Sequence, residues 1–223
     1  DPESDLDPDG TIADMGAYPY DQIANPIIWG CMDEEACNYN LDVNVDNGSC
    51  WDTGYDCGDL AVLHQFILNS QDSNNPIPLD LPPYELGEQT WQEDRLIDFC
   101  RHWGSCGTDY VLSGPLPENI GNWDAIIELH IGYNNLSGVI PESFGEMSSL
   151  QYLNMAENNF IGSLPESIGN LDNLEHMVIY ENGFTGPVTE GFCDMESLIA
   201  VHAYSLDFTT LPDCITNLST LEF

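Results

Sequence analysis

The sequence predicts an α/β solenoid, in which short coils of chain stack side by side, preceded by a helical cap and a small disulfide-rich module. Three observations predict it: an internal repeat in the second half of the chain, an amphipathic segment upstream of that repeat, and 8 cysteines in local clusters. A regular repeat indicates stacking because one repeat cannot bury its own apolar face.

The repeat is visible in four lines that begin at Ile126, Leu150, Leu174 and Leu198, with a spacing of 24 residues. Each line approximates LxxLxLxxNxLxGxIPxxIGNLxx. The apolar positions of one line are expected to point inward and stack on their equivalents in the next line. In the second line these positions are Leu153, Met155, Phe160, Leu164 and Ile168.

The other recurring positions have structural roles of their own. The LxL segment predicts a short strand that pairs in parallel with its neighbours and builds a concave sheet. An asparagine recurs where the strand turns away, and its amide can satisfy buried backbone groups. Glycines permit the bend and prolines shape the outer face. These residues are Asn134, Asn158 and Asn182, Gly138, Gly162 and Gly186, and Pro141 and Pro165.

This pattern resembles the plant-type leucine-rich repeat. The resemblance implies a parallel concave β-sheet and an irregular or 3₁₀ convex side over residues 94–223. The fourth line departs from the pattern, because Leu206 replaces the asparagine and Thr209-Thr210 replace the glycine-containing turn. We therefore expect a less regular coil there. The chain stops at Phe223 inside a line and starts without Met, so we expect a fragment of something longer.

Residues 58–93 are expected to cap the first coil. The segment DCGDLAVLHQFILNSQ fits an amphipathic helix with Leu60, Leu63, Phe66 and Ile67 on one face and Asp59 as its N-cap. A proline-rich stretch and GEQTWQEDRL follow. This arrangement resembles the N-terminal cap of plant-type repeats, which would shield the apolar edge of the first coil.

Two cysteine pairs are expected within the repeats. An imperfect coil starting at Leu96 carries extra residues around Cys100 and Cys106, which most simply close that insertion. Cys193 and Cys214 fall on the outer side of adjacent coils and are expected to bridge them. Two free buried thiols are the alternative for the second pair.

Residues 29–57 form a predicted cysteine-rich module. Its sequence GCMDEEACNYNLDVNVDNGSC resembles a small module of secreted marine bacterial and algal proteins. Related copies often lack the second cysteine, which implies a Cys31–Cys50 bridge and leaves Cys37 to pair with Cys57. Four cysteines allow three connectivities. The loop acids Asp33, Asp42 and Asp46 either bind a cation or are simply solvated.

Residues 1–28 are acidic. Asp5, Asp7 and Asp9 alternate before Gly10, as at the start of a calcium loop, and Asp14 closes a shorter cage. An EF-hand does not fit, because its twelfth position is Gly16. We expect calcium here. The segment DPDGTIADMGAY resembles the closing sequence of parallel β-helix domains, which implies the tail of a preceding domain.

The charge balance excludes two classes of function. The chain has 39 Asp and Glu against 2 Lys and Arg, a formal charge of −37. Nucleic-acid binding and docking on an anionic membrane both need clustered cations. An apolar run long enough for membrane insertion is missing, while 42% hydrophobic residues suffice for a core. The disulfides predict an extracellular or cell-surface location, where Asn47, Asn135 and Asn217 are possible glycosylation sites.

The sequence lacks the motifs for nucleophilic catalysis and for phosphate binding. Histidines and tyrosines gather on the predicted concave face. We interpret this composition as a binding face, because rings stack on sugars or protein side chains. A zinc site at His176 and His202, catalysis by a His–Glu pair and a merely solvated face are the alternatives. The predicted binding residues are His130, Tyr133, Tyr152, Asn154, His176, Tyr180, His202 and Tyr204, with Glu128, Glu157, Glu175 and Glu181 beside them.

The main hypothesis is a non-enzymatic extracellular recognition or adhesion module, stabilised by calcium, that binds a protein or glycan on its concave face. The alternative is a structural subunit that binds copies of itself in an extracellular filament or cell-surface polymer, because the last coil ends with an open edge. An accessory domain of a polysaccharide-degrading enzyme is a third possibility.

Overall fold

The computed structural model describes residues 28–51, 54–71, 75–101, 106, 110–214 and 220–222. The chain divides into two compact units, Asp1–Thr53 and Gly54–Phe223. Among the described residues, no helix is sufficiently long and apolar to span a bilayer.

The first unit is held by a short sheet and a disulfide. β1 (Trp29–Gly30) pairs in parallel with β2 (Val45–Asp46). The Cys31–Cys50 bridge, expected from the resemblance, is present. Cys37 and Cys57 are disulfide-bonded as well, and no free cysteine occurs. With so small a buried core, covalent closure supplies much of the constraint on this unit.

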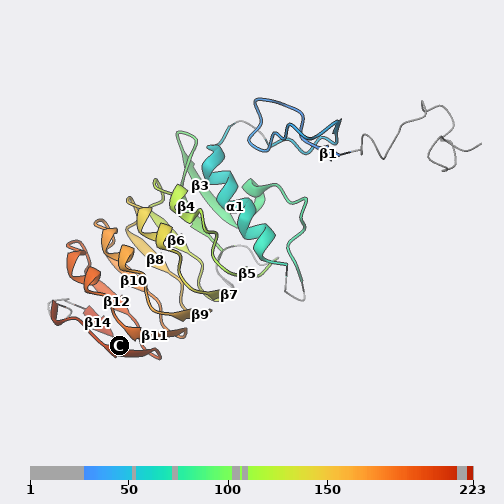
Figure 1. The fold of residues 1–223 in the computed structure, drawn as a ribbon. Coiled ribbons are helices and arrows are strands. Elements are labelled where there is room, and N and C mark those ends of the chain that lie inside the picture. The colour runs from blue at the N-terminus through green and yellow to red at the C-terminus, as the bar shows by residue number, and fades with distance from the viewer. Residues whose placement is uncertain are drawn as a thin grey trace, which may run out of the picture. The chain divides into compact units, whose positions relative to one another are not determined.

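The second unit is a solenoid whose strands follow one another in chain order (Figure 1). Its seven-stranded sheet has the order β14-β12-β10-β8-β6-β4-β3, and all neighbours except β3 and β4 are parallel. The strands are β3 (Glu88–Gln92), β4 (Arg95–Cys100), β6 (Glu128–His130), β8 (Tyr152–Asn154), β10 (His176–Val178), β12 (Ala200–His202) and β14 (Thr220–Glu222). We call the solvent-facing side of this sheet the concave face.

A second sheet and a row of 3₁₀ turns complete each coil. The second sheet has the order β13-β11-β9-β7-β5. Its strands are β5 (Ser113–Gly114), β7 (Asn135–Gly138), β9 (Asn159–Gly162), β11 (Gly183–Pro187) and β13 (Asp207–Thr210). The 3₁₀ helices are η2 (Ile120–Asn122), η3 (Glu142–Glu146), η4 (Glu166–Asn170) and η5 (Glu190–Asp194). The predicted parallel sheet and 3₁₀ convex side are therefore confirmed.

The apolar positions of the repeat stack in the core between these layers. The line starts Ile126, Leu150 and Leu174 are fully buried, and Leu198 is 7% exposed. Phe160 and Phe184 stack from consecutive coils with ring centroids 6.0 Å apart. Burying a large apolar side chain contributes about 1.5–3 kcal/mol, so each coil is stabilised chiefly by its neighbours.

The recurring asparagines link adjacent coils, as predicted. Asn158 Oδ1 accepts from the Leu136 amide at 3.0 Å, and its Nδ2 donates to the Ile131 carbonyl at 2.9 Å. Nδ2 also donates to Met155 and Ala156 in its own coil. Asn134 and Asn182 make equivalent bonds. Each side chain therefore satisfies both the coil that carries it and the coil before it.

The fourth line is more regular than the sequence indicated. Leu206 cannot make the asparagine bonds, yet β12 and β13 both form. In the described part of this line, the pairing of β11 with β13 shows a register shift between Gly186 and Pro187. The Cys193–Cys214 disulfide closes this end of the solenoid, so the alternative of two free thiols is wrong. Cys100 and Cys106 are also paired, as predicted.

The cap consists of α1 (Cys57–Asn69), η1 (Pro83–Glu85) and the β3–β4 hairpin. The predicted apolar face of the helix is buried. Phe66 of the helix and Phe99 of β4 both pack on the fully buried Trp123, at centroid distances of 5.6 and 5.3 Å. β3 adds an antiparallel strand beside the first coil, so the polar backbone edge of β4 is covered.

The predicted N-cap was wrong. The helix begins earlier, and Asp56 caps it by accepting a hydrogen bond from the Asp59 amide at 3.0 Å. Asp59 lies in the first turn and is fully buried. Its carboxylate accepts from Arg95 Nε at 2.9 Å and from the Leu96 amide at 2.8 Å. Arg95 also contacts Asp124, so one guanidinium joins the helix, β4 and the next coil.

Asn158→Ala is expected to destabilise the solenoid strongly. The change leaves the buried Leu136 amide without its partner and removes one of the two donors to the Ile131 carbonyl, which Asn134 still bonds. It should cost about 2–4 kcal/mol of unfolding free energy. Urea denaturation measures the loss. The exposed neighbour is the matched control, and Asn159→Ala should change the unfolding free energy by less than about 0.5 kcal/mol. Equal losses in the two variants would contradict the role of the asparagine.

Arg95→Met is expected to destabilise the cap in a pH-dependent way. Burial already raises the pKa of the Asp59 carboxyl, and without Arg95 only the hydrogen bond from the Leu96 amide still opposes that rise. In the variant, the raised pKa makes the folded state hold a proton on Asp59 that the unfolded state has released at neutral pH. The loss of unfolding free energy should therefore be largest at neutral pH, about 3 kcal/mol. It should shrink as the pH falls toward about 4. Thermal unfolding between pH 4 and 7 measures it.

Asp124→Asn is the control for that experiment, since it removes an exposed partner of Arg95 and should cost less than about 1 kcal/mol. A loss in Arg95→Met that grows on acidification would contradict this account of the Asp59 carboxylate.

Candidate functional site

The concave face carries every residue that the sequence proposed for binding. Leu129, Leu153, Met177 and Val201 of the four central strands are fully buried. Because side chains alternate along a strand, His130, Tyr152, Asn154, His176 and His202 face solvent, whereas Ala200 beside Val201 is buried. Tyr133, Tyr180 and Tyr204 follow the strands in the turns. The predicted residues accordingly lie at intermediate exposure, apart from Tyr204, which is 39% exposed. Their role in binding stays a prediction.

Two groups of rings cross the face. In the first, Tyr152 stacks on His130 at a centroid distance of 4.9 Å and lies 5.9 Å from His176. In the second, Tyr180 and Tyr204 stack at 4.4 Å with planes 11° apart. The Tyr133 hydroxyl lies 2.9 Å from that of Tyr180 and joins the second group across two coils. The rings therefore form two pre-ordered stripes.

The hydroxyl contact changes the ionisation of Tyr180. The hydrogen bond with Tyr133, together with partial burial, raises the pKa of Tyr180 to about 12. The phenols consequently stay neutral at physiological pH and present hydrogen-bonding oxygens to a partner.

A strained turn follows each of the four central strands of the concave sheet, β6, β8, β10 and β12. Tyr133, Glu157, Glu181 and Ser205 have φ between 51° and 59°, in the left-handed region that non-glycine residues rarely adopt. Tyr133, Glu157 and Glu181 each immediately precede one of the recurring asparagines of the repeat. The hydrogen bonds of that asparagine fix the turn. Sequence reasoning missed this conformation. The only feature of the sequence that could have indicated the left-handed turn is the polar or aromatic residue that stands before each recurring asparagine.

An acidic cluster lies at the N-terminal end of the face. Asp98 of β4 is directly opposite Glu128 of β6, and Cys100 is opposite His130. His130 Nε2 lies 3.1 Å from Glu128 Oε2. Burial and the nearby Glu128 raise the pKa of the Asp98 carboxyl. Asp98 was not among the predicted site residues, although aligning Leu96 with Ile126 places it level with Glu128.

The zinc alternative at His176 and His202 is not supported by the geometry. His176 is opposite Ala200, and His202 is opposite Val178, so the two imidazoles are offset along their strands. Within the described residues, one group of three metal-ligating side chains converges, and it is Asp98, Glu128 and His130.

Several predicted sites lie elsewhere. The calcium residues Asp5, Asp7, Asp9 and Asp14 and the sequon Asn217 fall outside the described residues. Asn47 and Asn135 are exposed. The acids of the cysteine-rich module do not converge within the described chain, and Asp33 and Asp46 accept hydrogen bonds from Glu35 and Gly48 in local turns.

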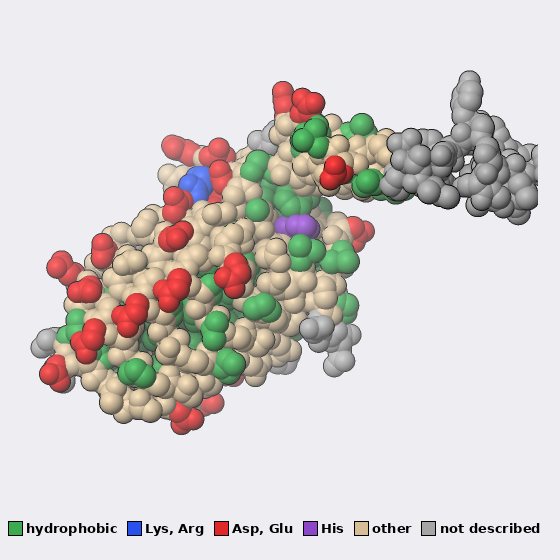
Figure 2. All heavy atoms as spheres, in the orientation of Figure 1, with side chains coloured by type: hydrophobic (Ala, Val, Ile, Leu, Met, Phe, Trp, Pro, Cys, Tyr) green, Lys and Arg blue, Asp and Glu red, His purple; other side chains and the backbone are tan. Residues whose placement is uncertain are grey.

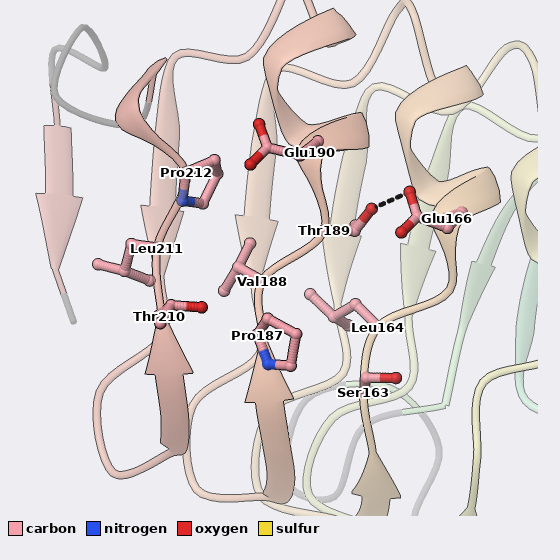
Figure 3. A pocket seen from close by; sticks show the side chains of 10 residues that line it. All are labelled: Ser163, Leu164, Glu166, Pro187, Val188, Thr189, Glu190, Thr210, Leu211 and Pro212. Atoms are coloured by element: carbon pink, nitrogen blue, oxygen red, sulfur yellow. Dashed lines mark hydrogen bonds between the residues drawn. The ribbon is translucent and has the colours of Figure 1, made fainter.

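A groove of about 310 Å³ runs between the last coils, outside the concave face. Figure 3 shows Leu164, Val188 and Leu211 along it, with Thr189 bonded to Glu166 above them. The Thr189 hydroxyl also accepts from the Gly191 amide at the start of η5. The central polar group is thus already occupied in capping, and we assign no ligand to the groove.

Comparisons with known proteins agree on the fold. The family model Leucine Rich Repeat matches residues 125–147 and 149–171. The ectodomain of the receptor kinase SOBIR1 from Arabidopsis thaliana has a TM-score of 0.57 at 21% identity, covering 76% of this chain and 93% of that one. The BIR2 ectodomain from the same plant has a TM-score of 0.53 at 20% identity, covering 70% and 82%.

A third structure contains a bound peptide. The Arabidopsis receptor kinase HAESA, in complex with the peptide hormone IDA and the co-receptor SERK1, has a TM-score of 0.54 at 18% identity. The match covers 74% of this chain and only 33% of HAESA. A search of curated proteins gave no match. The fold is a leucine-rich-repeat solenoid, as the sequence predicted, while the resemblances of the two N-terminal segments stay predictions.

Tyr180 is expected to ionise near pH 12, because the folded state retains its phenolic proton. Because its pKa is higher in the folded state, Tyr180 contributes to the free energy of unfolding. This contribution is complete below the unfolded-state pKa of about 10 and is lost as the pH rises through the folded-state pKa. The tyrosinate absorbance of the wild type minus that of Tyr180→Phe should therefore show one group with a midpoint near 12. A midpoint near the unperturbed value would contradict the hydrogen bond with Tyr133.

Proposed function

We propose that the chain is an extracellular recognition module that holds a positively charged segment of a protein partner on its concave face. The pre-ordered Tyr180–Tyr204 stack, set on an acidic surface, is the observation that carries the proposal. Aromatic faces attract cationic side chains, and Arg and Lys are bound more tightly where carboxylates lie nearby.

The rings supply contact area at little entropic cost. Tyr180 already contacts both Tyr133 and Tyr204, in a group that spans four coils, so binding does not need to order these rings. Tyrosine has few rotatable bonds, and its hydroxyl stays hydrogen-bonded when its ring is covered. An extended segment running across the strands would meet both ring groups.

The charge favours a cationic occupant. Glu157, Glu175 and Glu181 are exposed beside the rings. Both cations of the chain are occupied elsewhere, since Arg95 bonds Asp59 and Asp124, and Arg101 is 3% exposed. Asp and Glu are also spread over the surface shown in Figure 2, where Arg and Lys appear at one small place. Such a field steers a cationic partner and repels an acidic one.

The fold is compatible with this role. HAESA, which shares the solenoid fold, was crystallised with a peptide hormone and a co-receptor. The disulfides support an oxidising, extracellular setting. Three earlier expectations stay predictions: a glycan ligand, assembly into a filament, and calcium at Asp5, Asp7, Asp9 and Asp14. Binding of a cationic segment on the concave face is tested independently of them.

Replacement of both tyrosines should weaken binding without changing the charge. We expect Tyr180→Ala/Tyr204→Ala to reduce affinity for a labelled Arg-Gly repeat peptide about tenfold in 0.15 M salt, through loss of ring contacts. Fluorescence anisotropy measures it. The control Ile161→Ala removes an exposed apolar side chain of β9, outside this face, and should leave affinity unchanged.

Two results would contradict the proposal. Unchanged affinity of the double variant would mean that the peptide binds through diffuse charge alone. Binding of a neutral oligosaccharide that depends on the same tyrosines, with no such dependence for the peptide, would assign the face to glycans.

A further inference from the structure

Three metal-ligating atoms converge at the N-terminal end of the concave face. The ligand atoms of Asp98, Glu128 and His130 all lie within 4.8 Å of one another. For three atoms at that limit, the point between them is about 2.8 Å from each, and zinc bonds to nitrogen and oxygen are about 2.0–2.2 Å. Since the His130–Glu128 pair is already closer, at 3.1 Å, small side-chain rotations would complete the contacts.

The backbone holds these residues in place. Asp98 and Glu128 are directly opposite each other on parallel strands, and His130 follows on the same face of β6. Strand β4 is flanked on its other side by β3, where Thr90 is opposite Asp98. The His130 ring is further fixed by stacking on Tyr152 at 4.9 Å. The site therefore rests on the sheet and on no flexible loop.

Asp98 is costly without a counter-ion. Its Oδ1 is buried and lacks a hydrogen-bond partner among the described residues. Glu128 and Glu88 add negative charge beside it, and among the groups that the structure describes here, His130 opposes that charge. Like charges directly opposite on neighbouring strands are destabilising, as is a buried acceptor with no donor. Arg95 of the same strand is bonded to Asp59 and Asp124.

We propose that Asp98, Glu128 and His130 bind one divalent metal ion, with zinc the metal that fits best. Zinc accepts imidazole nitrogen and carboxylate oxygen in one site, whereas calcium and magnesium prefer oxygen alone. The ion neutralises the facing carboxylates and gives the orphan Asp98 oxygen a partner. Three protein ligands leave a fourth position for water.

Isothermal titration of the whole chain with zinc chloride tests this site. In 0.15 M salt with excess magnesium to occupy the acidic surface, we expect one saturable zinc site. Asp98→Asn and His130→Ala should each weaken zinc affinity at least about tenfold, since each removes a ligand. His176→Ala, a concave-face histidine outside the group, is the matched control and should change the affinity by less than about twofold.

Thermal unfolding supplies a second readout. In the absence of metal, Asp98→Asn should be at least as stable as the wild type, because the like-charge repulsion is gone. Zinc should raise the midpoint of the wild type and leave that of Asp98→Asn unchanged. If Asp98→Asn fails to fold, Glu128→Gln takes its place as the test variant. The Glu128 side chain is 52% exposed, so this change should weaken zinc binding without preventing folding.

The proposal would be overturned by diffuse, weak zinc binding with no single site. It would equally be overturned if His176→Ala weakened binding as much as His130→Ala, or if Glu128→Gln bound zinc as the wild type does. Since Tyr180 and Tyr204 are untouched, these results are independent of the peptide experiment.

Discussion

The structure depends on burial of each coil against the next. A single coil has too little apolar surface to offset the loss of chain entropy, so the stack folds only when Leu, Ile and Phe positions align in columns. The asparagines add a directional requirement to this burial. Asn158 bonds both to its own coil and to the preceding one, so it fixes the spacing of coils and leaves few buried polar groups unpaired.

That constraint also creates the candidate binding face. Once the inward positions are fixed, the alternate residues of each strand must point outward in regular columns. The left-handed turn before each asparagine holds Tyr133 and its equivalents at the strand ends. The cap extends the same order to β4, because Arg95 joins the buried Asp59 to the first coil. Asp98 of β4 thereby lies opposite Glu128 of β6.

Most of the fold could be predicted from the sequence, because Leu150, Asn158 and Gly162 recur with a period that only one architecture explains. The β3–β4 hairpin could not, since its turn uses Glu93 and Asp94 at positive φ and lacks the glycine that normally marks such turns. The N-cap was misplaced because Asp56 and Asp59 are both plausible caps, and tertiary pairing with Arg95 decided between them. Asp98 was missed because the residues around Cys100 and Cys106 interrupt the period.

Native-state hydrogen exchange tests the central claim most directly. The Ile131, Met155 and Ile179 amides each donate to the strand of the following coil. If coils stabilise one another, these three amides should exchange with similar opening free energies, close to the global unfolding free energy. Independent opening of each coil, with free energies far below that of global unfolding, would contradict the account.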